Sequence, residues 1–525
     1  MDSLEADDQL TILNRSTEYR ISKKLIRKVP YFERMLSHEC LETKENKVEL
    51  DFDEQDFKSF LSWIKLDSAI IDMDYVITLC DISDYFGMDY EVQKFNEYFR
   101  QKFSMEHLPT IIHQVTETSM LINSHTLNAF ICCHFLRIKN SYAASYSFKK
   151  YFWLEYPVET IEYICALNLM IYSEYQVFEA IERWVNFNVD SRKCHLERLL
   201  RLVRWCYLGD KDLFEIKENE LVKSSGFQPR SCLSFKDNCD CVSDRAKQHC
   251  LIIIEQLEGT DLRIIVLDSK LVLLFNRDLK LDRSISLNLL HDEHVSIIFY
   301  YSGRKAIRVD WNRNAYRFFK DTDIGPYISG TCELNVNYWS KYWRRPPSFS
   351  PFYRYKIRDK TDAGFFYATG HEESEYWLNR VMRTADKIIN DSRLHDWVMY
   401  FRLTVLSDNI FILTNNLAFG KFNVRQKHFK KIELPKLRET NELEYKSLFI
   451  TSSKVHADRV FLIDASTKNV FCFNITNQEW SFFGGLFIDP YPSSNSGKSF
   501  GNCPMESEKL ITLTQAFLPL DLIYT

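Results

Sequence analysis

The spacing of apolar residues changes once along this chain, and that change limits what each part can fold into. Up to about residue 225, apolar residues recur every three to four positions, which is the period of an amphipathic helix. Beyond about residue 226, short β-rich runs separated by turn residues replace this pattern. We therefore expect a helical part followed by a β-rich part.

The first ~100 residues mix the two patterns, which is typical of a small α/β domain. Leu10–Leu13 and Tyr19–Ile21 alternate as the strands of a hairpin do, and Val48–Leu50 is expected to be a short strand. Asp53 is a good N-cap for the next helix. In that helix the apolar residues fall at i, i+3, i+4 and i+7, namely Phe57, Phe60, Leu61 and Ile64.

Residues 105–225 are expected to be almost entirely helical. The clearest helix opens at Ser173, with Gln176 three residues on as in a capping box. Short helices joined by short links form an array without a pocket of its own. The buried stripe of the clearest helix contains Val177, Ala180, Ile181, Trp184 and Val185, and that of a later helix contains Leu196, Leu199, Leu200 and Val203.

Residues 226–248 are polar and uneven, as in a linker, and residues 249–525 carry the recurring β-rich runs. This is too much antiparallel structure for one small sandwich. Repeats of ~40–50 residues divide it into roughly six blades of a β-propeller. The expected strands include Leu262–Leu267, Val295–Tyr301, Phe401–Leu406, Ile410–Thr414, Arg459–Ile463 and Val470–Ile475.

Two segments resemble known domains. Residues Tyr31 to Leu36, followed by Val48–Leu50 and the Phe57 helix, resemble the centre of a BTB domain. The second segment is similar to the BACK domain of kelch-like proteins, and its motif residues are Trp153 to Thr160, Ser173-Glu174, Val177 to Ala180, Trp184-Val185 and Leu199 to Arg204. The resemblance implies an α/β BTB domain (1–104), an all-α BACK domain (105–225), a linker (226–248) and an all-β domain (249–525).

One β-rich unit resembles a kelch repeat. It contains the strand Phe471–Ile475, then Gln478-Glu479-Trp480 and Gly484-Gly485, the one Gly-Gly pair in the chain. Kelch repeats usually carry such a pair in each blade, so this all-β domain is a diverged propeller or another β fold.

The resemblance implies a non-catalytic adaptor of a cullin-3 RING E3 ubiquitin ligase, with no cofactor or metal. The BTB-like domain would bind cullin 3, and the β domain would bind an unidentified target protein. The family's hydrophobic-x-Glu motif aligns with Cys40-Leu41-Glu42, where Cys40 is a weaker apolar plug than methionine or leucine. Leu36 supports the same surface, whereas Met35 is expected in the core, and ordinary loop residues are the alternative for Cys40 and Glu42.

The resemblance also implies a homodimer through the BTB-like domain, although only about eight residues precede the first expected strand. The short N-terminus and the Cys40 plug leave a second hypothesis open. In it, the chain is an interaction scaffold without ubiquitination, such as a cytoskeletal organiser or a competitive mimic of kelch-like adaptors. An enzyme in the β region is a third hypothesis, but it lacks a catalytic constellation.

Composition bears on location and partners. The formal net charge of −5 gives no general reason to bind nucleic acid, and we interpret the basic stretch Lys421 to Lys431 as a solvated face. The acidic N-terminus lacks the pattern of a signal peptide, and no apolar run reaches the ~18 residues that span a bilayer. We expect a cytoplasmic protein without membrane contact, and nuclear localisation stays open.

Three motifs that suggest ligand sites are incomplete. Gly497-Lys498-Ser499 lacks the earlier glycine of a phosphate-binding loop, since Pro492 stands there. His291 to His294 is not a zinc-protease motif and is expected to be a polar turn. A zinc site at Cys239, Cys241, His249 and Cys250 would lack paired C-x-x-C knuckles, so we interpret these as incidental thiols.

The β region also contains a dense group of residues that are common anchors at protein interfaces. Aromatic and arginine side chains supply most binding hot spots, although most aromatic residues of a β fold lie in its core. We therefore treat this group as a candidate target site. Its members are Tyr338, Trp339, Tyr342, Trp343, Arg344 and Arg345.

Overall fold

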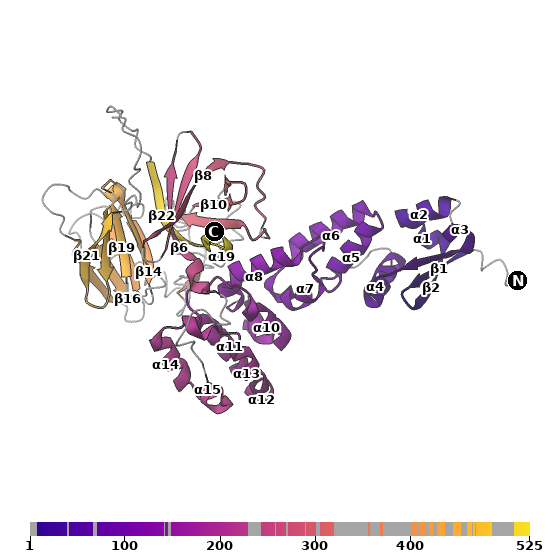
Figure 1. Cartoon of the computed structure of the whole chain (residues 1–525), viewed down its shortest axis with the longest axis horizontal. Coiled ribbons are helices and arrows are strands. Elements are labelled where there is room, and N and C mark those ends of the chain that lie inside the picture. The colour runs from indigo at the N-terminus through magenta and orange to yellow at the C-terminus, as the bar shows by residue number, and fades with distance from the viewer. Residues whose placement is uncertain are drawn as a thin grey trace, which may run out of the picture. The chain divides into compact units, whose positions relative to one another are not determined.

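The computed structural model describes most of the helical part and, with gaps, the β-rich part. The chain divides into two compact units, Met1–Ile131 with Asn140–Ile164 and Cys132–Lys139 with Cys165–Thr525. Figure 1 labels the elements of both units. The described residues are 8–38, 41–66, 71–140, 142–144, 149–228, 243–257, 259–268, 271–288, 290–300, 305–319, 355–357, 368–370, 401–406, 409–414, 417, 419–423, 428–435, 445–452, 459–464, 466–467, 469–485 and 509–524.

The first unit contains a three-stranded sheet in the order β2-β1-β3. Strands β1 (Gln9–Asn14) and β2 (Thr17–Ser22) form the expected antiparallel hairpin, and β3 (Lys47–Leu50) runs parallel to β1. Alternate residues of β1, such as Leu10 and Ile12, are fully buried. One face of this sheet therefore packs on the helices, as in other two-layer α/β arrangements.

The helix after Asp53 has the predicted register. The Asp53 carboxylate accepts N–H bonds from Gln55 and Asp56, and all four residues of the predicted stripe are buried. The helices that lie wholly in the first unit are α1 (Lys23–Ile26), α2 (Pro30–Ser37), α3 (Leu41–Glu45), α4 (Glu54–Lys65), α5 (Val76–Tyr85), α6 (Asp89–Lys102), α7 (Leu108–Gln114) and α9 (Phe152–Glu155), with the 3₁₀ turn η2 (Met105–His107).

One short β-hairpin departs from the expectation that residues 105–225 are almost entirely helical. Strands β4 (Tyr142–Ala144) and β5 (Lys149–Tyr151) pair antiparallel. The segment is rich in tyrosine, serine and lysine and carries no apolar stripe of helical period. Its sequence therefore predicted neither a helix nor a strand. Helices α8 (Ser124–Ile138) and α10 (Val158–Ala166) flank the hairpin, and each belongs partly to both units.

The predicted stripe of α11 (Tyr175–Phe187) is buried, but the helix begins two residues later than the capping-box pattern suggested. Ser173 Oγ accepts from the Tyr175 N–H, and Gln176 Oε1 accepts from the Tyr172 N–H. The Ser173 side chain thus caps the helix from outside it, and the Gln176 side chain reaches back from the first turn to the residue before Ser173. The remaining helices are α12 (Val189–Arg192), η3 (Lys193–His195), α13 (Leu196–Leu200), η4 (Trp205–Tyr207), α14 (Asp210–Glu218), α15 (Glu220–Ser225), η6 (Arg245–Gln248), η8 (Tyr445–Ser447) and α19 (Leu520–Tyr524).

The β-rich part contains one seven-stranded sheet and two four-stranded antiparallel sheets. The seven-stranded sheet has the order β22-β6-β7-β8-β11-β10-β9, and β22 also contacts β9, so this sheet curls until its ends meet. Its strands are β6 (His249–Gln256), β7 (Leu262–Leu267), β8 (Leu273–Leu281), β9 (Val295–Tyr300), β10 (Lys305–Asp310), β11 (Ala315–Phe318) and β22 (Lys509–Phe517).

The two four-stranded sheets have strands in simple sequence order. One contains β14 (Phe401–Leu406), β15 (Asn409–Thr414), β16 (Phe419–Asn423) and β17 (His428–Ile432). The other contains β18 (Leu448–Ser452), β19 (Arg459–Asp464), β20 (Asn469–Asn474) and β21 (Glu479–Gly485), and a separate hairpin pairs β12 (Tyr355–Ile357) with β13 (Ala368–Gly370). The six strands predicted from sequence each correspond to an observed strand within one residue at either end.

These sheets pack face to face because their strands are apolar on both sides. On β6, Ile252 and Ile254 pack toward β9 and β10, whereas Leu251 and Ile253 pack toward β18–β20. The β18–β21 sheet is likewise covered on its other face by β14–β16, through a second cluster of buried residues. Strands that are buried on both faces have continuous runs of apolar residues in their sequence. This is why apolar and polar residues do not alternate along His249–Gln256.

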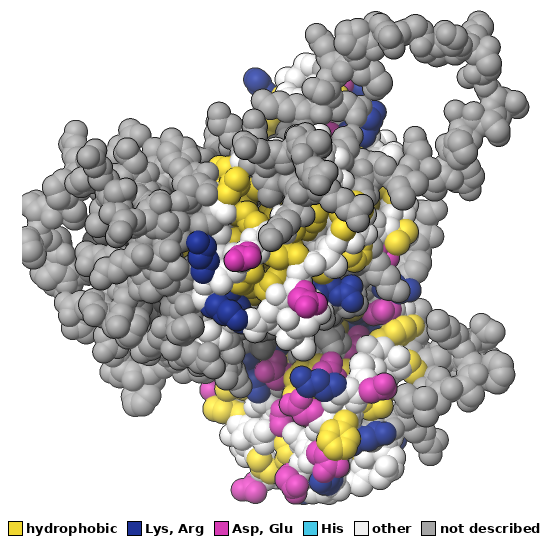
Figure 2. Space-filling view, turned by 90° about the vertical axis from the view of Figure 1, so that its left-hand side faces the viewer, with side chains coloured by type: hydrophobic (Ala, Val, Ile, Leu, Met, Phe, Trp, Pro, Cys, Tyr) yellow, Lys and Arg dark blue, Asp and Glu magenta, His cyan; other side chains and the backbone are white. Residues whose placement is uncertain are grey.

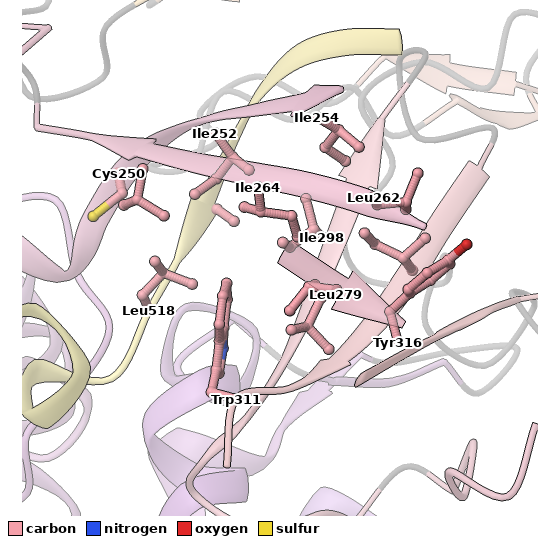
Figure 3. Close-up of a cluster of buried hydrophobic side chains, with 14 residues drawn as sticks. Cys250, Ile252, Ile254, Leu262, Ile264, Leu279, Ile298, Trp311, Tyr316 and Leu518 are labelled. Carbon is pink, nitrogen blue, oxygen red and sulfur yellow. The ribbon is translucent and has the colours of Figure 1, made fainter. Parts of the chain in front are cut away.

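One cluster of buried side chains lies between β6–β8 and β9–β11. Ile252, Ile264 and Ile298 are fully buried and point toward one another, and Trp311 closes the cluster below them (Figure 3). The Trp311 indole N–H donates to Ser296 Oγ at 2.9 Å, so its one polar atom is satisfied. Burial of each aliphatic side chain of this size contributes about 1.5–3 kcal/mol.

Surface charge is mixed where it can be seen. The face shown in Figure 2 presents Lys and Arg side chains interspersed with Asp and Glu, with apolar side chains gathered between them in its upper half. Among the described residues of this face, side chains of both signs are interspersed and form no single-sign patch of the kind that steers a polyanion.

We expect Ile264→Ala to lower the free energy of unfolding of the β region by about 2–5 kcal/mol, because it leaves a cavity in a core that cannot fully collapse. Hydrogen-exchange mass spectrometry on β6 and β7 peptides measures this change directly. Val272→Ala is the matched control, since Val272 is 57% exposed, and should change exchange by less than about 0.5 kcal/mol. Equal effects of the two substitutions would contradict the described packing.

Candidate functional site

The candidate surface begins at the short helix α2. Pro30 occupies its first turn, where the missing N–H costs nothing and the fixed φ suits a helix. The buried Phe32 ring packs against Phe86 at 5.1 Å between centroids, which fixes the rotation of the helix. Leu36 and Met35 are consequently only half-buried, at the edge of this contact.

Helix α3 is held against the end of α2. The Thr43 hydroxyl donates to the Met35 carbonyl at 2.7 Å, and the Thr11 N–H donates to the Asn46 carbonyl at 3.0 Å where α3 leads into β3. Asn46 takes a φ of 51°, the left-handed conformation that asparagine tolerates in a tight turn. With both ends anchored, the first turn of α3 presents Leu41 and Glu42 outward.

The structure brings three of the four predicted cullin-contact residues to one surface. Leu41 is 66% exposed and Glu42 is exposed, while Leu36 lies half-buried on the adjoining helix. Cys40, the predicted plug, lies outside the described residues. Leu41 occupies the middle position of the hydrophobic-x-Glu motif, so the described part of this surface offers an exposed apolar side chain directly beside the Glu42 carboxylate.

Sequence reasoning missed Tyr85, which adjoins this surface. Its ring is 59% exposed and packs edge-on against Phe52 at 5.1 Å and against Tyr31 at 6.3 Å, so it is held in one place beside α2. The sequence did contain a signal for this residue, because Tyr85 lies off the buried stripe of α5 that includes Val76 and Leu79. A large aromatic side chain off the stripe is a candidate for contact with a partner.

The predicted target cluster, residues 338–345, and the Gly497-Lys498-Ser499 motif lie outside the described residues. Of the thiols and histidines considered for zinc, His249 packs between the Tyr172 and Phe517 rings, and Cys250 is buried in the apolar cluster of β6. Residues 291–294 lie in the connection between β8 and β9, as expected for a polar turn. Within the described ranges, no three His, Cys, Asp or Glu side chains are grouped so as to hold a metal ion.

Three buried cysteines among the described residues are suited to packing rather than to nucleophilic chemistry. Burial raises the pKa of the Cys80, Cys165 and Cys250 thiols to about 12, so the thiolate is a negligible fraction at neutral pH. A catalytic cysteine needs the opposite environment, with a nearby cation and access to solvent. Searched over the same described segments, the chain has no helix long and apolar enough to cross a bilayer.

Comparison with known families identifies the central helices. Residues 125–218 match the model of the family described as BACK, BTB And C-terminal Kelch. The match confirms the BACK-like segment and supports a BTB–BACK–kelch-like architecture for the chain. A BACK domain is typical of kelch-like adaptors of cullin 3, proteins that are generally non-catalytic.

We expect native-state alkylation with iodoacetamide at pH 8 to modify Cys194 and to spare Cys80, Cys165 and Cys250. Cys194 is the fully exposed thiol among the described residues, whereas burial holds the other three in the thiol form. Peptide mass spectrometry reads each site separately, and alkylation in urea supplies the fully labelled control. Rapid native labelling of Cys165 or Cys250 would show that the packing described for them is wrong.

Proposed function

We propose that this chain is a substrate-recognition adaptor of a cullin-3 RING E3 ubiquitin ligase. The observation that carries the proposal is the BACK match at residues 125–218, with an α/β unit before it and stacked β-sheets after it. In this arrangement the first unit binds cullin 3 and the β region binds the protein to be ubiquitinated. The adaptor raises the effective concentration of the target and orients it, and the ligase supplies the bond-making chemistry.

The exposed surface of α2, α3 and α5 supports the cullin contact. Burial of Leu41 in an apolar notch would contribute about 1.5–3 kcal/mol, and Glu42 lies at the rim, where a carboxylate improves orientation more than affinity. Tyr85 adds an amphipathic ring that is already held in position, so little conformational freedom is lost on binding. Leu36 and Cys40 complete the proposed contact.

We further propose that the β region is a six-bladed propeller. The contacts between β14 and β18, between β18 and β22, and between β22 and β9 are those of adjacent innermost strands around an axis. The C-terminal strand β22 completes the sheet that begins at β6, which is how a ring of blades closes. The interval of about 80 residues between β11 and β14 has the length of two further blades.

The target-binding site within this proposal is the predicted aromatic and arginine group at Tyr338, Trp339, Tyr342, Trp343, Arg344 and Arg345. The same proposal implies a cytoplasmic protein, with nuclear localisation equally compatible, and self-association through the BTB-like unit. It requires no cofactor, because the chain only positions its two partners.

We expect the full-length chain to bind the N-terminal domain of cullin 3 in a calorimetric titration. Leu41→Asp should weaken binding at least tenfold, because it places a charge where an apolar side chain must be desolvated. Glu42→Ala should have a smaller effect, since the carboxylate lies at the rim.

Two matched variants serve as controls. Leu66→Asp changes another exposed leucine of the same unit, 72% accessible at the end of α4, and Glu45→Ala changes another exposed carboxylate of α3. Both should bind cullin 3 as the native chain does. Absence of binding by the folded native chain would sink the adaptor proposal and would favour the interaction scaffold.

A further inference from the structure

A short segment just before the β region is buried in the BACK-matching helices. The Asp244 side chain caps η6 by accepting the Ala246 N–H. This turn brings Arg245 and Gln248 inward until only 1% and 2% of these side chains remain exposed. Charged and amide side chains are rarely buried so completely unless they are paired, so their partners reveal what the segment does.

Arg245 contacts groups from three separate segments of the BACK-matching region. Its Nη2 donates to the Cys165 carbonyl at 3.0 Å and to the Leu202 carbonyl at 3.2 Å. Its Nε lies 3.4 Å from Oε1 of Glu174, a carboxylate that is itself 1% exposed. Burial raises the pKa of Glu174, whereas the Arg245 guanidinium and the Arg204 backbone N–H oppose that shift by stabilising the charged carboxylate.

Arg204 and Gln248 make further hydrogen bonds around the Arg245–Glu174 pair. Glu174 Oε2 accepts the Arg204 backbone N–H at 3.2 Å, and the Arg204 guanidinium donates to the Ser243 carbonyl at 2.8 Å. Gln248 Nε2 donates to the carbonyls of Asn168 and Leu169 at 3.2 and 2.9 Å. The segment 243–248 is therefore bonded to the helices at several points rather than at one.

The end of the β region is attached at this same point. The Leu518 N–H donates to the Gln248 carbonyl at 2.8 Å, directly after β22, which pairs with β6. The Tyr172 ring lies 4.9 Å from the His249 ring and 5.0 Å from the Phe517 ring. Tyr172, in the connection between α10 and α11, thus contacts both the first and the last strand of the β region.

We infer that residues 243–249 and 517–518 form a fixed joint that locks the β6–β22 sheet onto the helices that follow α10. The chain does not rely on its covalent linker to hold the two parts together. Because a desolvated ion pair is strong only in one geometry, the joint selects a single orientation of the sheet on the helices. Under the proposed adaptor function, it would present the bound target in one pose, so that only some target lysines face the ligase.

The joint can be tested by cutting the linker of the folded full-length protein. A specific protease site inserted between Ser234 and Phe235 leaves all joint residues in place. After cleavage, the two native fragments should co-elute in size-exclusion chromatography at micromolar concentration. The double variant Glu174→Gln, Arg245→Met removes the pair without leaving a lone buried charge, and it should weaken fragment association at least ~100-fold.

A matched control is available on the same helices. Glu197 and Arg201 form an ion pair at 2.8 Å but are 57% and 70% exposed. Glu197→Gln, Arg201→Met should leave fragment association within about twofold of the native value, since exposed pairs contribute little. Gln248→Leu is a second joint variant, which alters no charge and should also weaken fragment association. Circular dichroism of each uncut variant checks that it folds.

Separation of the cut native fragments would overturn the inference, as would joint variants that remain associated as firmly as the control. Cullin binding, measured on the same uncut samples, depends on the first unit alone. A protein that binds cullin 3 but separates on cleavage would refute the joint and leave the adaptor function standing. A protein whose cut fragments stay associated but that does not bind cullin 3 would support the joint and refute the adaptor function.

Discussion

The pairing of β22 with β6 is the constraint on which the β region depends. These two strands come from opposite ends of that region, yet they pair along eight positions and share a sheet whose two faces are both buried. Without β22, the row of N–H and C=O groups on one edge of β6 would be left unpaired in the middle of a packed structure, at a cost of several kcal/mol. One face of the β6–β7 part of this sheet packs on β18–β20, and the other face packs on β9 and β10.

Most local structure was predictable because it follows from short-range periodicity. The α4 stripe, the Asp53 cap and the α11 stripe were read correctly, and the six strands predicted in the β region agree with the observed ones to within a residue. Pairing between distant strands was not predictable from one sequence. The parallel contact of β11 with β8 is an example, since it depends on long-range packing rather than on a turn motif.

The candidate site shows where pattern reasoning ends. Leu41 and Glu42 of the motif are exposed, and their contact with cullin 3 stays a prediction. The Tyr85 ring is held beside α2 by tertiary contacts with Phe52 and Tyr31, which no local pattern contains. Arg245 was read as part of a polar linker, because an arginine among polar residues ordinarily indicates solvent exposure. Its burial depends on carbonyl groups about 40 and 80 residues earlier in the chain, which no local window contains.

Strand β6 is synthesised long before β22, with which it pairs. It leaves the ribosome about 250 residues before its partner β22 does, which at ~5–20 residues per second amounts to at least on the order of ten seconds. Throughout that interval an apolar strand stands with an open edge, the kind of template that pairs with other nascent chains. A chain whose translation stops before Lys509 keeps this open edge, so we expect truncated chains to aggregate more readily than complete ones.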